Sequence, residues 1–506
     1  MLLVLLVLAT SILFYLYHEF LGKRKGLPPG PMPLPLIGNM AQFRDPRRII
    51  QYSQEATAAF GPVYTFWIGN VPFVVITDYS IMRDALVGQA EAFSGRANSF
   101  LFETVARGRY GLFQVDGPLW KEQRRFTLHV LRDFGFGRNL MEQRIMREVD
   151  YLVSGICEQL KQEIGHETVG AELQLDQALN LCVGNIINVL TLGYSFEGGD
   201  EKFLRLKQLL EDNFRHMARP ECLLLLNVYP WLRHIPILGR FGYAKLWQQV
   251  QDFWQFFQQE LDEHKRKFDP AVEPEDYATA YLKEMARRQE NGESMGYFSD
   301  WQLLVSLLGL WIAGLETTVT TLRWGILYML HYPSVQEKCR SELLQVTRST
   351  RGLSYADRLA TPYTSATLLE IQRFANIIAF SPGHKLLEDV ELCGYHLKKG
   401  TQILPNIGFV HADPKIFPQP DKFLPERFLE KDGFTMKKVE ELVPFSLGKR
   451  QCLGESLARM ELYLIFGSLL QHFRFAAVEK EGPPSLDPIP GVTFAPKVYT
   501  VRVEKL

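Results

Sequence analysis

The stretch FSLGKRQCLG occupies residues 445–454. Within it, Cys452 can supply a thiolate, which is a soft and anionic metal ligand. Gly448 and Gly454 carry no side chains, so the backbone can come close to a large, flat partner. Arg450 offers a planar fork of hydrogen-bond donors to an anionic group. Together these features indicate a flat, anionic cofactor that contains a metal.

The residues after Cys452, LGESLARMELYLIFGSLLQHF, have apolar side chains at helical spacing. Cys452 is therefore expected at or just before a helix N-terminus, where the helix dipole and free N–H groups favour a thiolate over a thiol. A single thiolate in a glycine-containing loop beside an arginine suits the fifth ligand of haem iron. The alternative is a buried structural cysteine in a turn, but the surrounding pattern favours the ligand.

This segment resembles the haem loop of the cytochrome P450 superfamily, the haem-thiolate monooxygenases, and the resemblance covers nearly the whole chain. The chain is most similar to the microsomal animal group that acts on drugs, fatty acids and steroids. The resemblance implies a mostly α haem-thiolate monooxygenase fold with small β regions near both ends of the chain. It also implies haem b as the cofactor, Cys452 as its axial ligand, and Phe445, Gly448 and Arg450 as neighbouring haem-binding residues.

The composition limits the class of protein. A net charge of −1 gives no support for nucleic-acid binding. Six scattered cysteines without a CxxC pair argue against a disulfide framework and favour a reducing compartment.

No linker or repeat divides the chain after residue 40. We expect a membrane anchor at residues 1–22, a basic and proline-rich hinge at 23–40, and one haem-thiolate catalytic domain at 41–506.

The N-terminal stretch MLLVLLVLATSILFYLY, residues 1–17, is uncharged. As a helix extended to residue 21 it would span about 31 Å, close to the ~30 Å hydrocarbon core of a bilayer. Lys23, Arg24 and Lys25 follow at once, and the positive-inside rule places them in the cytosol. We expect an uncleaved single-span anchor in the endoplasmic reticulum membrane, with the catalytic domain on the cytosolic face. The alternatives are a cleaved signal peptide, which lacks its basic start and cleavage site here, and a short re-entrant segment.

Two segments after the anchor have clear local signals. The sequence LPPGPMPLPLIGN, residues 27–39, cannot form a helix or a central strand and is expected to be a stiff, extended spacer. Residues 63–77 alternate apolar and polar side chains around Gly69-Asn70, which predicts a β-hairpin. Similar features follow the anchor in the microsomal relatives.

Trp120 and Arg124 are four residues apart and share a helix face, so an indole N–H and a guanidinium can bind one carboxylate. They match the family's Trp-x-x-x-Arg helix, whose Trp and Arg bind a haem propionate. By the same resemblance, Arg96 and His384 bind propionates together with Arg450. An exposed loop arginine and a solvent-facing histidine are the alternatives for Arg96 and His384.

Several basic residues surround the Trp120 helix, namely Lys121, Arg125, Arg132 and Arg138. They form either a solvated helix face or a docking surface for an acidic electron donor. In the family this donor is a membrane-bound flavoprotein reductase that uses NADPH, with cytochrome b5 as a possible second partner. The chain has no nucleotide-binding fingerprint of its own, so NADPH would act only through the reductase.

Residues 303–330, LLVSLLGLWIAGLETTVTTLRWGILYML, are apolar on nearly all sides of a helix. Threonines and two charges make burial through a large domain a better expectation than a membrane span. Residues 313–317, AGLET, match the family's oxygen-binding helix. Ala313 and Gly314 are small enough to let the helix approach a flat cofactor. Glu316 and Thr317 are expected to be catalytic and to relay protons to bound dioxygen, although a back-bonded helix hydroxyl is the alternative for Thr317.

Substrate contacts are expected on three segments, by resemblance to the family. Aromatic residues crowd a glycine-bearing loop at residues 100–113, and apolar residues recur at 377–380 and 492–494. The predicted pocket residues are Phe100, Phe102, Phe113, Ile377, Ile378, Val492 and Phe494. Membrane lipid is a further expected contact, because the apolar residues 222–238 form either a core segment or a membrane-facing patch.

Glu370 and Arg373 form a Glu-x-x-Arg pair, a spacing that also occurs at Glu122/Arg125, Glu284/Arg287 and Glu337/Arg340. By resemblance, Glu370, Arg373 and Arg427 make a buried network that stabilises the fold, and we do not expect them to be catalytic.

The implied reaction is insertion of one oxygen atom from O2 into a lipophilic substrate, which could be a fatty acid, a steroid or a xenobiotic. One alternative is a haem-thiolate isomerase or dehydratase that rearranges a peroxide without O2 or a reductase. The Glu316–Thr317 pair and the basic face of Lys121 and Arg125 speak against it. The other alternative is a non-catalytic haem sensor or carrier, in which the aromatic loop and the proton-relay pair would have no purpose.

Overall fold

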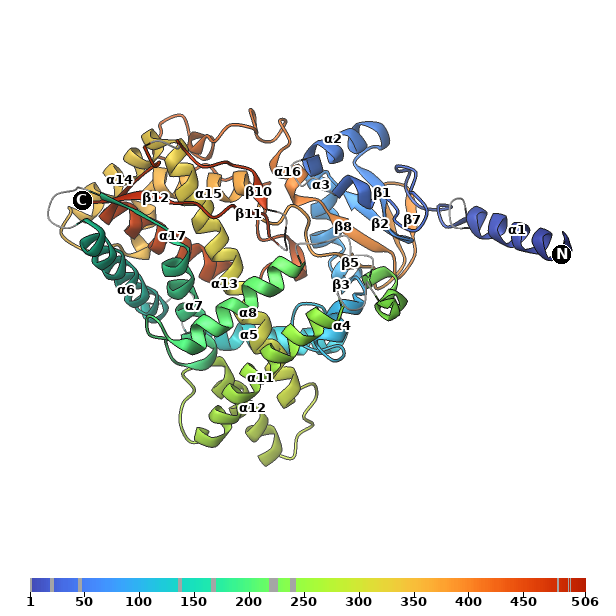
Figure 1. Ribbon diagram of the computed structural model, residues 1–506, viewed down its shortest axis with the longest axis horizontal. Helices are drawn as coiled ribbons and strands as arrows, with labels where there is room; N and C mark the ends of the chain where they lie inside the picture. Colours follow the sequence, from blue (N-terminus) through green and yellow to red (C-terminus); the bar gives the residue numbers. More distant parts are fainter. Residues whose placement is uncertain are drawn as a thin grey trace.

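The computed structural model describes residues 2–18, 22–43, 48–134, 139–164, 170–217, 226–236, 243–479, 482–489, 491 and 493–506. Helices dominate these residues, with α13 at the centre of a large helical lobe (Figure 1). A smaller lobe that contains a sheet lies beside it, and α1 projects from that smaller lobe. The predicted mostly α fold with small β regions is confirmed.

The principal helices are α1 (Leu2–Tyr17), α2 (Ile49–Phe60), α3 (Tyr79–Arg83), α4 (Phe100–Val105), α5 (Gly117–Asp133), α6 (Asn139–Ile164), α7 (Asp176–Leu192), α8 (Glu201–Met217), α11 (Ala244–Lys267), α12 (Tyr277–Glu290), α13 (Asp300–His331), α14 (Pro333–Thr347), α15 (Pro362–Ala375), α16 (Ile407–His411) and α17 (Glu455–His472). Short helical turns that matter below are η2 (Met40–Phe43), η5 (Ala92–Ser94), η9 (Pro425–Phe428) and η10 (Gly448–Arg450).

The strands are β1 (Val63–Ile68), β2 (Val71–Ile76), β3 (Gly95–Arg96), β4 (Gly170–Leu173), β5 (His384–Lys385), β6 (Val390–Leu392), β7 (Tyr395–Leu397), β8 (Gln402–Pro405), β9 (Phe473–Ala476), β10 (Pro488–Ile489), β11 (Ala495–Pro496) and β12 (Val501–Lys505). The sheet of the smaller lobe has the order β1-β2-β8-β5-β3. The predicted hairpin is its first pair, with Val63 opposite Ile76 and Gly69 in the turn at φ 58°. In the helical lobe, β4, β12 and β9 form a second sheet.

The helix α13 is the core of the larger lobe. It is the one helix of the described residues that is long and apolar enough to cross a membrane. Its central residues are buried, however, including Trp311 and Leu327, and it packs against α7, α15 and α17. A helix that is apolar on nearly all sides is stable in water only when other elements cover it, as they do here.

The helix α1 has 16 residues, and those of its apolar side chains that the structure describes are exposed, with Leu3 at 77% and Phe14 at 71%. It stands away from both lobes (Figure 1). At 1.5 Å per residue it would span about 24 Å. Residues 19–21 of the predicted membrane span lie outside the described residues, and the anchor stays a prediction.

The proline-rich segment is extended, as expected, but it also packs along the free edge of β1. The Thr65 N–H donates to the Pro29 carbonyl (2.9 Å), and the Thr65 hydroxyl donates to the Pro28 carbonyl (2.7 Å). A Cβ on Gly30 would lie 2.0 Å from the Thr65 carbonyl oxygen, so this approach requires glycine. The segment thereby covers an edge strand that would otherwise expose unpaired backbone groups.

Candidate functional site

The loop around Cys452 is held between η10 and α17. The Cys452 N–H donates to the Phe445 carbonyl (2.9 Å), which closes the loop. Gly454 is the N-cap of α17, so Cys452 precedes the helix N-terminus by two residues, as predicted. The Cys452 thiol is accessible, yet burial raises its pKa, against the opposing effects of the Gly454 N–H and Arg124. A metal cation bound at this sulfur would favour the thiolate.

The two glycines of the loop have different roles. Gly448 has a φ of 70°, and a Cβ there would lie 1.8 Å from the Leu86 carbonyl oxygen. Gly448 is therefore required by the protein's own packing. A Cβ on Gly454 would meet no described atom within 4 Å. The expectation that both glycines let the backbone approach a flat cofactor stays a prediction.

Arg450 lies over the Trp120 ring, with its guanidinium carbon 3.7 Å from the ring centre. It donates to the carbonyls of Ser94 (2.7 Å) and Val115 (2.6 Å). Burial, followed by the nearby charge of Arg96, lowers the pKa of Arg450 to about 8. Arg450 forms no ion pair among the described residues, so its buried charge would be stabilised by an anion bound nearby.

Arg96 and His384 lie opposite each other on β3 and β5. Burial, and then the charge of Arg124, lowers the pKa of Arg96 to about 10. The Phe93 carbonyl accepts a hydrogen bond from His384 Nδ1 (2.7 Å), whereas His384 Nε2 is buried with no partner among the described residues. Burial and Arg96 lower the pKa of His384 to about 3. A carboxylate at Nε2 would reverse this shift by favouring the protonated ring.

The five residues predicted to bind propionates therefore come together from four segments of the chain. They are Arg96, Trp120, Arg124, His384 and Arg450. The nearest carboxylate, Asp116, is already paired with Arg109 (2.7 Å) and Lys385 (3.1 Å). Buried like charges that lower one another's pKa values require an anionic partner. The two propionates of haem are such a partner, so the residues present fit this cofactor.

A stripe of small or partly exposed residues runs along the otherwise buried α13. Val305, Gly309, Ala313 and Thr317 are spaced by four residues and share one helix face. Gly309 and Ala313 are exposed, whereas Trp311 and Leu315 on the other side of the helix are buried. Ala313 is thus placed to face a flat cofactor. Gly314 serves a different purpose, because a Cβ there would lie 2.4 Å from Ile187 Cδ1 in α7.

Glu316 and Thr317 have separate hydrogen-bond partners. The Thr317 hydroxyl donates to the Ala313 carbonyl (2.7 Å), which is the back-bonded arrangement considered above. Glu316 Oε1 accepts from the Thr493 hydroxyl (2.8 Å) and the Thr320 hydroxyl (3.3 Å). Thr493 lies in the predicted substrate-contact segment 492–494, but its bond to Glu316 was not predicted. The carboxylate is therefore held by the C-terminal segment.

The predicted aromatic loop is partly helical, because residues Phe100–Val105 form α4. The Ser99 hydroxyl caps this helix by accepting from the Phe102 N–H. Phe102 and Phe113 are exposed, and their ring centres are 5.6 Å apart. Phe100 instead stacks on Tyr243 at 6.3 Å.

Sequence analysis also missed Gln302, a buried α13 residue that holds the same loop. Its amide accepts from the Gly111 N–H (2.9 Å) and donates to the Gly111 carbonyl (3.1 Å). The pair of bonds fixes the loop backbone against α13.

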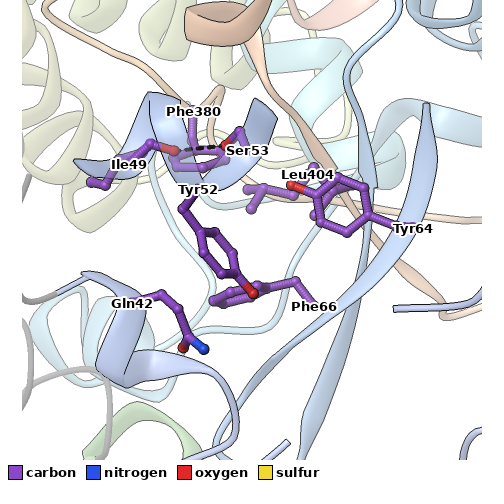
Figure 2. Close-up of a pocket in the computed structure, with 9 residues that line it drawn as sticks. Gln42, Ile49, Tyr52, Ser53, Tyr64, Phe66, Phe380 and Leu404 are labelled. Carbon is purple, nitrogen blue, oxygen red and sulfur yellow. Dashed lines mark hydrogen bonds between the residues drawn. The ribbon is translucent and has the colours of Figure 1, made fainter. Parts of the chain in front are cut away.

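The other predicted pocket segments lie side by side. The Phe494 N–H donates to the Ile377 carbonyl (2.8 Å), and Ile377, Ile378 and Phe494 are partly exposed. Val492 lies outside the described residues. Phe380 lines a separate small cavity between α2 and the sheet, where the hydroxyl of Tyr52 is buried without a described partner (Figure 2).

For residues 222–238, the choice between a core segment and a membrane-facing patch stays a prediction. Leu226 is buried, whereas Trp231 is exposed. Residues 222–225 and 237–238 of this stretch lie outside the described residues.

Glu370, Arg373 and Arg427 form a buried network. Arg373 donates two hydrogen bonds to Glu370 (2.7 and 2.8 Å), and Arg427 donates a third (3.1 Å). The Leu424 N–H also donates to Glu370 (2.8 Å). These contacts join α15 to the segment around η9.

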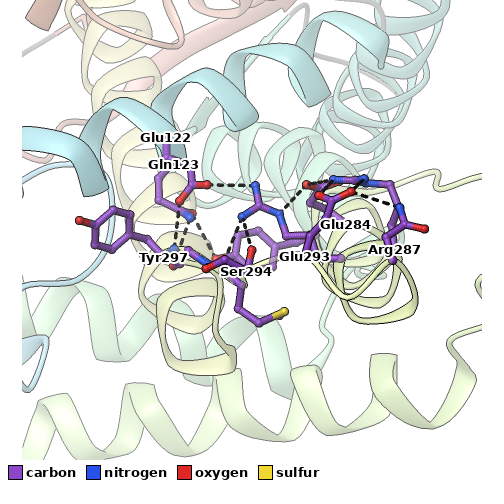
Figure 3. A network of polar contacts seen from close by, with 12 residues as sticks. Glu122, Gln123, Glu284, Arg287, Glu293, Ser294 and Tyr297 are labelled. Atoms are coloured by element: carbon purple, nitrogen blue, oxygen red, sulfur yellow. Dashed lines mark hydrogen bonds and ion pairs between the residues drawn. The ribbon is translucent and has the colours of Figure 1, made fainter.

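The helix α5, which carries Trp120 and Arg124, is held from its other side by a polar network (Figure 3). Glu122 pairs with Arg288 of α12 (3.0 Å) and accepts from the Tyr297 N–H (2.9 Å). Gln123 donates to the Tyr297 carbonyl (3.2 Å). This network positions α5 and could not be predicted from the sequence.

Comparison with known proteins agrees with this geometry. A family model described as cytochrome P450 matches residues 28–503. Cytochrome P450 2J2 from Homo sapiens is 36% identical over 495 residues, covering 97% of this chain and 94% of the relative. Cytochrome P450 2B19 from Mus musculus is 36% identical, covering 99% and 98%. A probable cytochrome P450, CYP36A1 from Caenorhabditis elegans, is 34% identical, covering 99% of both chains. The chain therefore belongs to the cytochrome P450 family, and it is a haem-thiolate monooxygenase that uses haem b.

Proposed function

We propose that this protein inserts one oxygen atom from O2 into a lipophilic substrate at the endoplasmic reticulum membrane, with electrons that originate from NADPH. The observation that carries the proposal is the exposed Cys452 beside the buried Arg96 and Arg450, which form no ion pair among the described residues. Haem b, when bound, supplies the iron at which dioxygen is activated.

In this proposal the chain's own residues would hold the cofactor. Cys452 would be the metal ligand, and the loop from Phe445 to Gly448 would support it. Arg96, Trp120, Arg124, His384 and Arg450 would bind the propionates through charge-assisted hydrogen bonds. Ala313 would contribute a small surface that the cofactor can contact.

Protons reach the site through Glu316 and Thr317. Glu316 is held by Thr493 at 2.8 Å and gives up or accepts a proton at its carboxylate. Thr317 has a hydroxyl bonded to the Ala313 carbonyl at 2.7 Å, and its oxygen can still accept a hydrogen bond. Thr317→Ala and Glu316→Gln should each lower the amount of product formed per NADPH consumed.

The substrate class follows from the apolar residues Phe102, Phe113, Ile377, Ile378 and Phe494, which suit a fatty acid, a steroid or a xenobiotic. The exposed apolar helix α1 supports attachment to the membrane. The electron donor is an NADPH-dependent flavoprotein reductase, with cytochrome b5 as a second candidate. Lys121 and Arg125, which are exposed on α5, provide a basic surface for it.

The test is product formation from a panel of lipophilic substrates by the full-length, haem-loaded protein in lipid vesicles. The proposal requires product only when NADPH, the reductase and O2 are all present. Product from a peroxide substrate without these three would favour the isomerase or dehydratase. Haem binding without any product would favour a sensor or carrier.

A further inference from the structure

Glu91, at the N-cap of η5, joins two lysines from separate parts of the surface. Its carboxylate pairs with Lys121 of α5 (3.0 Å) and with Lys449 in the loop that precedes Cys452. The side chains of all three residues are largely exposed, at 54% for Glu91, 53% for Lys121 and 41% for Lys449. The hydrogen bonds from Lys449 and then Lys121 lower the pKa of Glu91, so the carboxylate is charged at neutral pH.

Other carboxylates on this surface have partners elsewhere. Glu122 follows Lys121 directly in α5, but it is bound to Arg288 of α12 (3.0 Å). Glu455 pairs with Arg459 on its own helix α17 (2.8 Å). Among the described ion pairs, Glu91 is the partner of both lysines.

We propose that Glu91 is a displaceable internal counter-ion that competes with an acidic partner protein for Lys121 and Lys449. The inference rests on the proposed function, in which an acidic electron donor docks on this face. Exposed ion pairs are weak and are screened by salt, so carboxylates of a partner can replace Glu91. The displaced carboxylate then remains beside those of the partner and repels them.

Glu91 would thereby lower the affinity for the electron donor without changing the docking lysines. The Glu91 carboxylate would help the electron donor to dissociate between electron transfers, because weaker binding mostly reflects faster dissociation. The partner is identified by its chemistry, which is a protein surface rich in carboxylates.

The experiment compares the full-length, haem-loaded wild type with Glu91→Gln in binding to the NADPH-dependent flavoprotein reductase. We expect Glu91→Gln to tighten Kd by about 3- to 10-fold at an ionic strength of about 0.02 M, and the difference to vanish near 0.5 M. The matched control is Glu55→Gln, which removes the same charge from α2, where Glu55 is exposed and accepts from Gln51 of the same helix. Its Kd should equal that of the wild type.

A thermodynamic cycle makes the test specific. In a Lys121→Gln/Lys449→Gln background, Glu91→Gln should tighten binding less than it does in the wild type, because no lysine remains to be released and only the repulsion by Glu91 is removed. Glu91→Ser repeats the test with another neutral side chain, and the haem absorption confirms that each variant is loaded.

Three outcomes would overturn the inference. An unchanged Kd of Glu91→Gln, while the wild type binds the reductase, overturns the inference and leaves the proposed function intact. Equal tightening by Glu55→Gln would assign the effect to net charge alone. No binding of the wild type at either ionic strength would overturn both the inference and the reductase route.

Discussion

Replacing Arg373 by Met tests how much the buried Glu370 network contributes to stability. The Arg373 side chain is 2% exposed and makes five hydrogen bonds, two to Glu370 and three to backbone carbonyls. Removing one partner of a buried ion pair costs roughly 3–5 kcal/mol. Arg427 stays 3.1 Å from Glu370 and compensates in part. We therefore expect a loss near the lower end, about 3 kcal/mol, or more than a hundredfold in the unfolding equilibrium.

The chain contains a matched control with the same spacing. Glu337 and Arg340 also form a Glu-x-x-Arg pair (3.2 Å), but the Glu337 side chain is 55% exposed. Arg340→Met should cost less than about 1 kcal/mol, because exposed pairs contribute little. Urea unfolding of the haem-loaded protein, followed by tryptophan fluorescence, measures both variants. The reasoning is refuted if Arg373→Met unfolds at the same urea concentration as Arg340→Met.

Two further predictions concern other parts of the fold. Gly448→Ala should abolish stable haem binding, because its Cβ would lie 1.8 Å from the Leu86 carbonyl oxygen. The Cβ of Gly454→Ala would meet no described atom within 4 Å, so this variant should retain more haem. The haem absorption of both purified variants measures the difference. Burial, and then Arg373, lowers the pKa of His411 from 6.5 to about 3, so below about pH 6.5 the unfolded chain binds a proton that the folded chain does not. His411 should therefore lower the free energy of unfolding by up to ~1.4 kcal/mol for each pH unit between about 6.5 and 3. In urea titrations at pH 7, 6 and 5, the free energy of unfolding of His411→Gln should depend less steeply on pH than that of the wild type.

Local patterns in the sequence predicted those features that depend on near neighbours. The helix after Cys452, the shared face of Trp120 and Arg124, and the hairpin at 63–77 follow from periodicity and turn residues. The buried Glu370–Arg373 pair followed from resemblance, since its spacing alone is not distinctive. In these cases the residues that interact are close in sequence, or their motif is specific.

Contacts between distant segments could not be predicted where no family motif marked them. The hydrogen bond from Thr493 to Glu316 joins residues that are 177 positions apart in the sequence. The hydrogen bond between Gln302 and Gly111 joins residues that are 191 positions apart. Pairing of β4 with β12 likewise depends on the whole topology. The helix α4 was missed because its six residues are too few for a periodic signal, and the nearby glycines suggested a loop.

The central claim is that Cys452 is the thiolate ligand of a haem bound between its loop and α13. The most direct measurement is the absorption spectrum of the reduced, carbon-monoxide-bound protein, for the wild type and for Cys452→Ser. We predict a strongly red-shifted Soret band in the wild type that disappears in Cys452→Ser. An unshifted band, like that of a histidine-ligated haem, in folded wild type would contradict the claim.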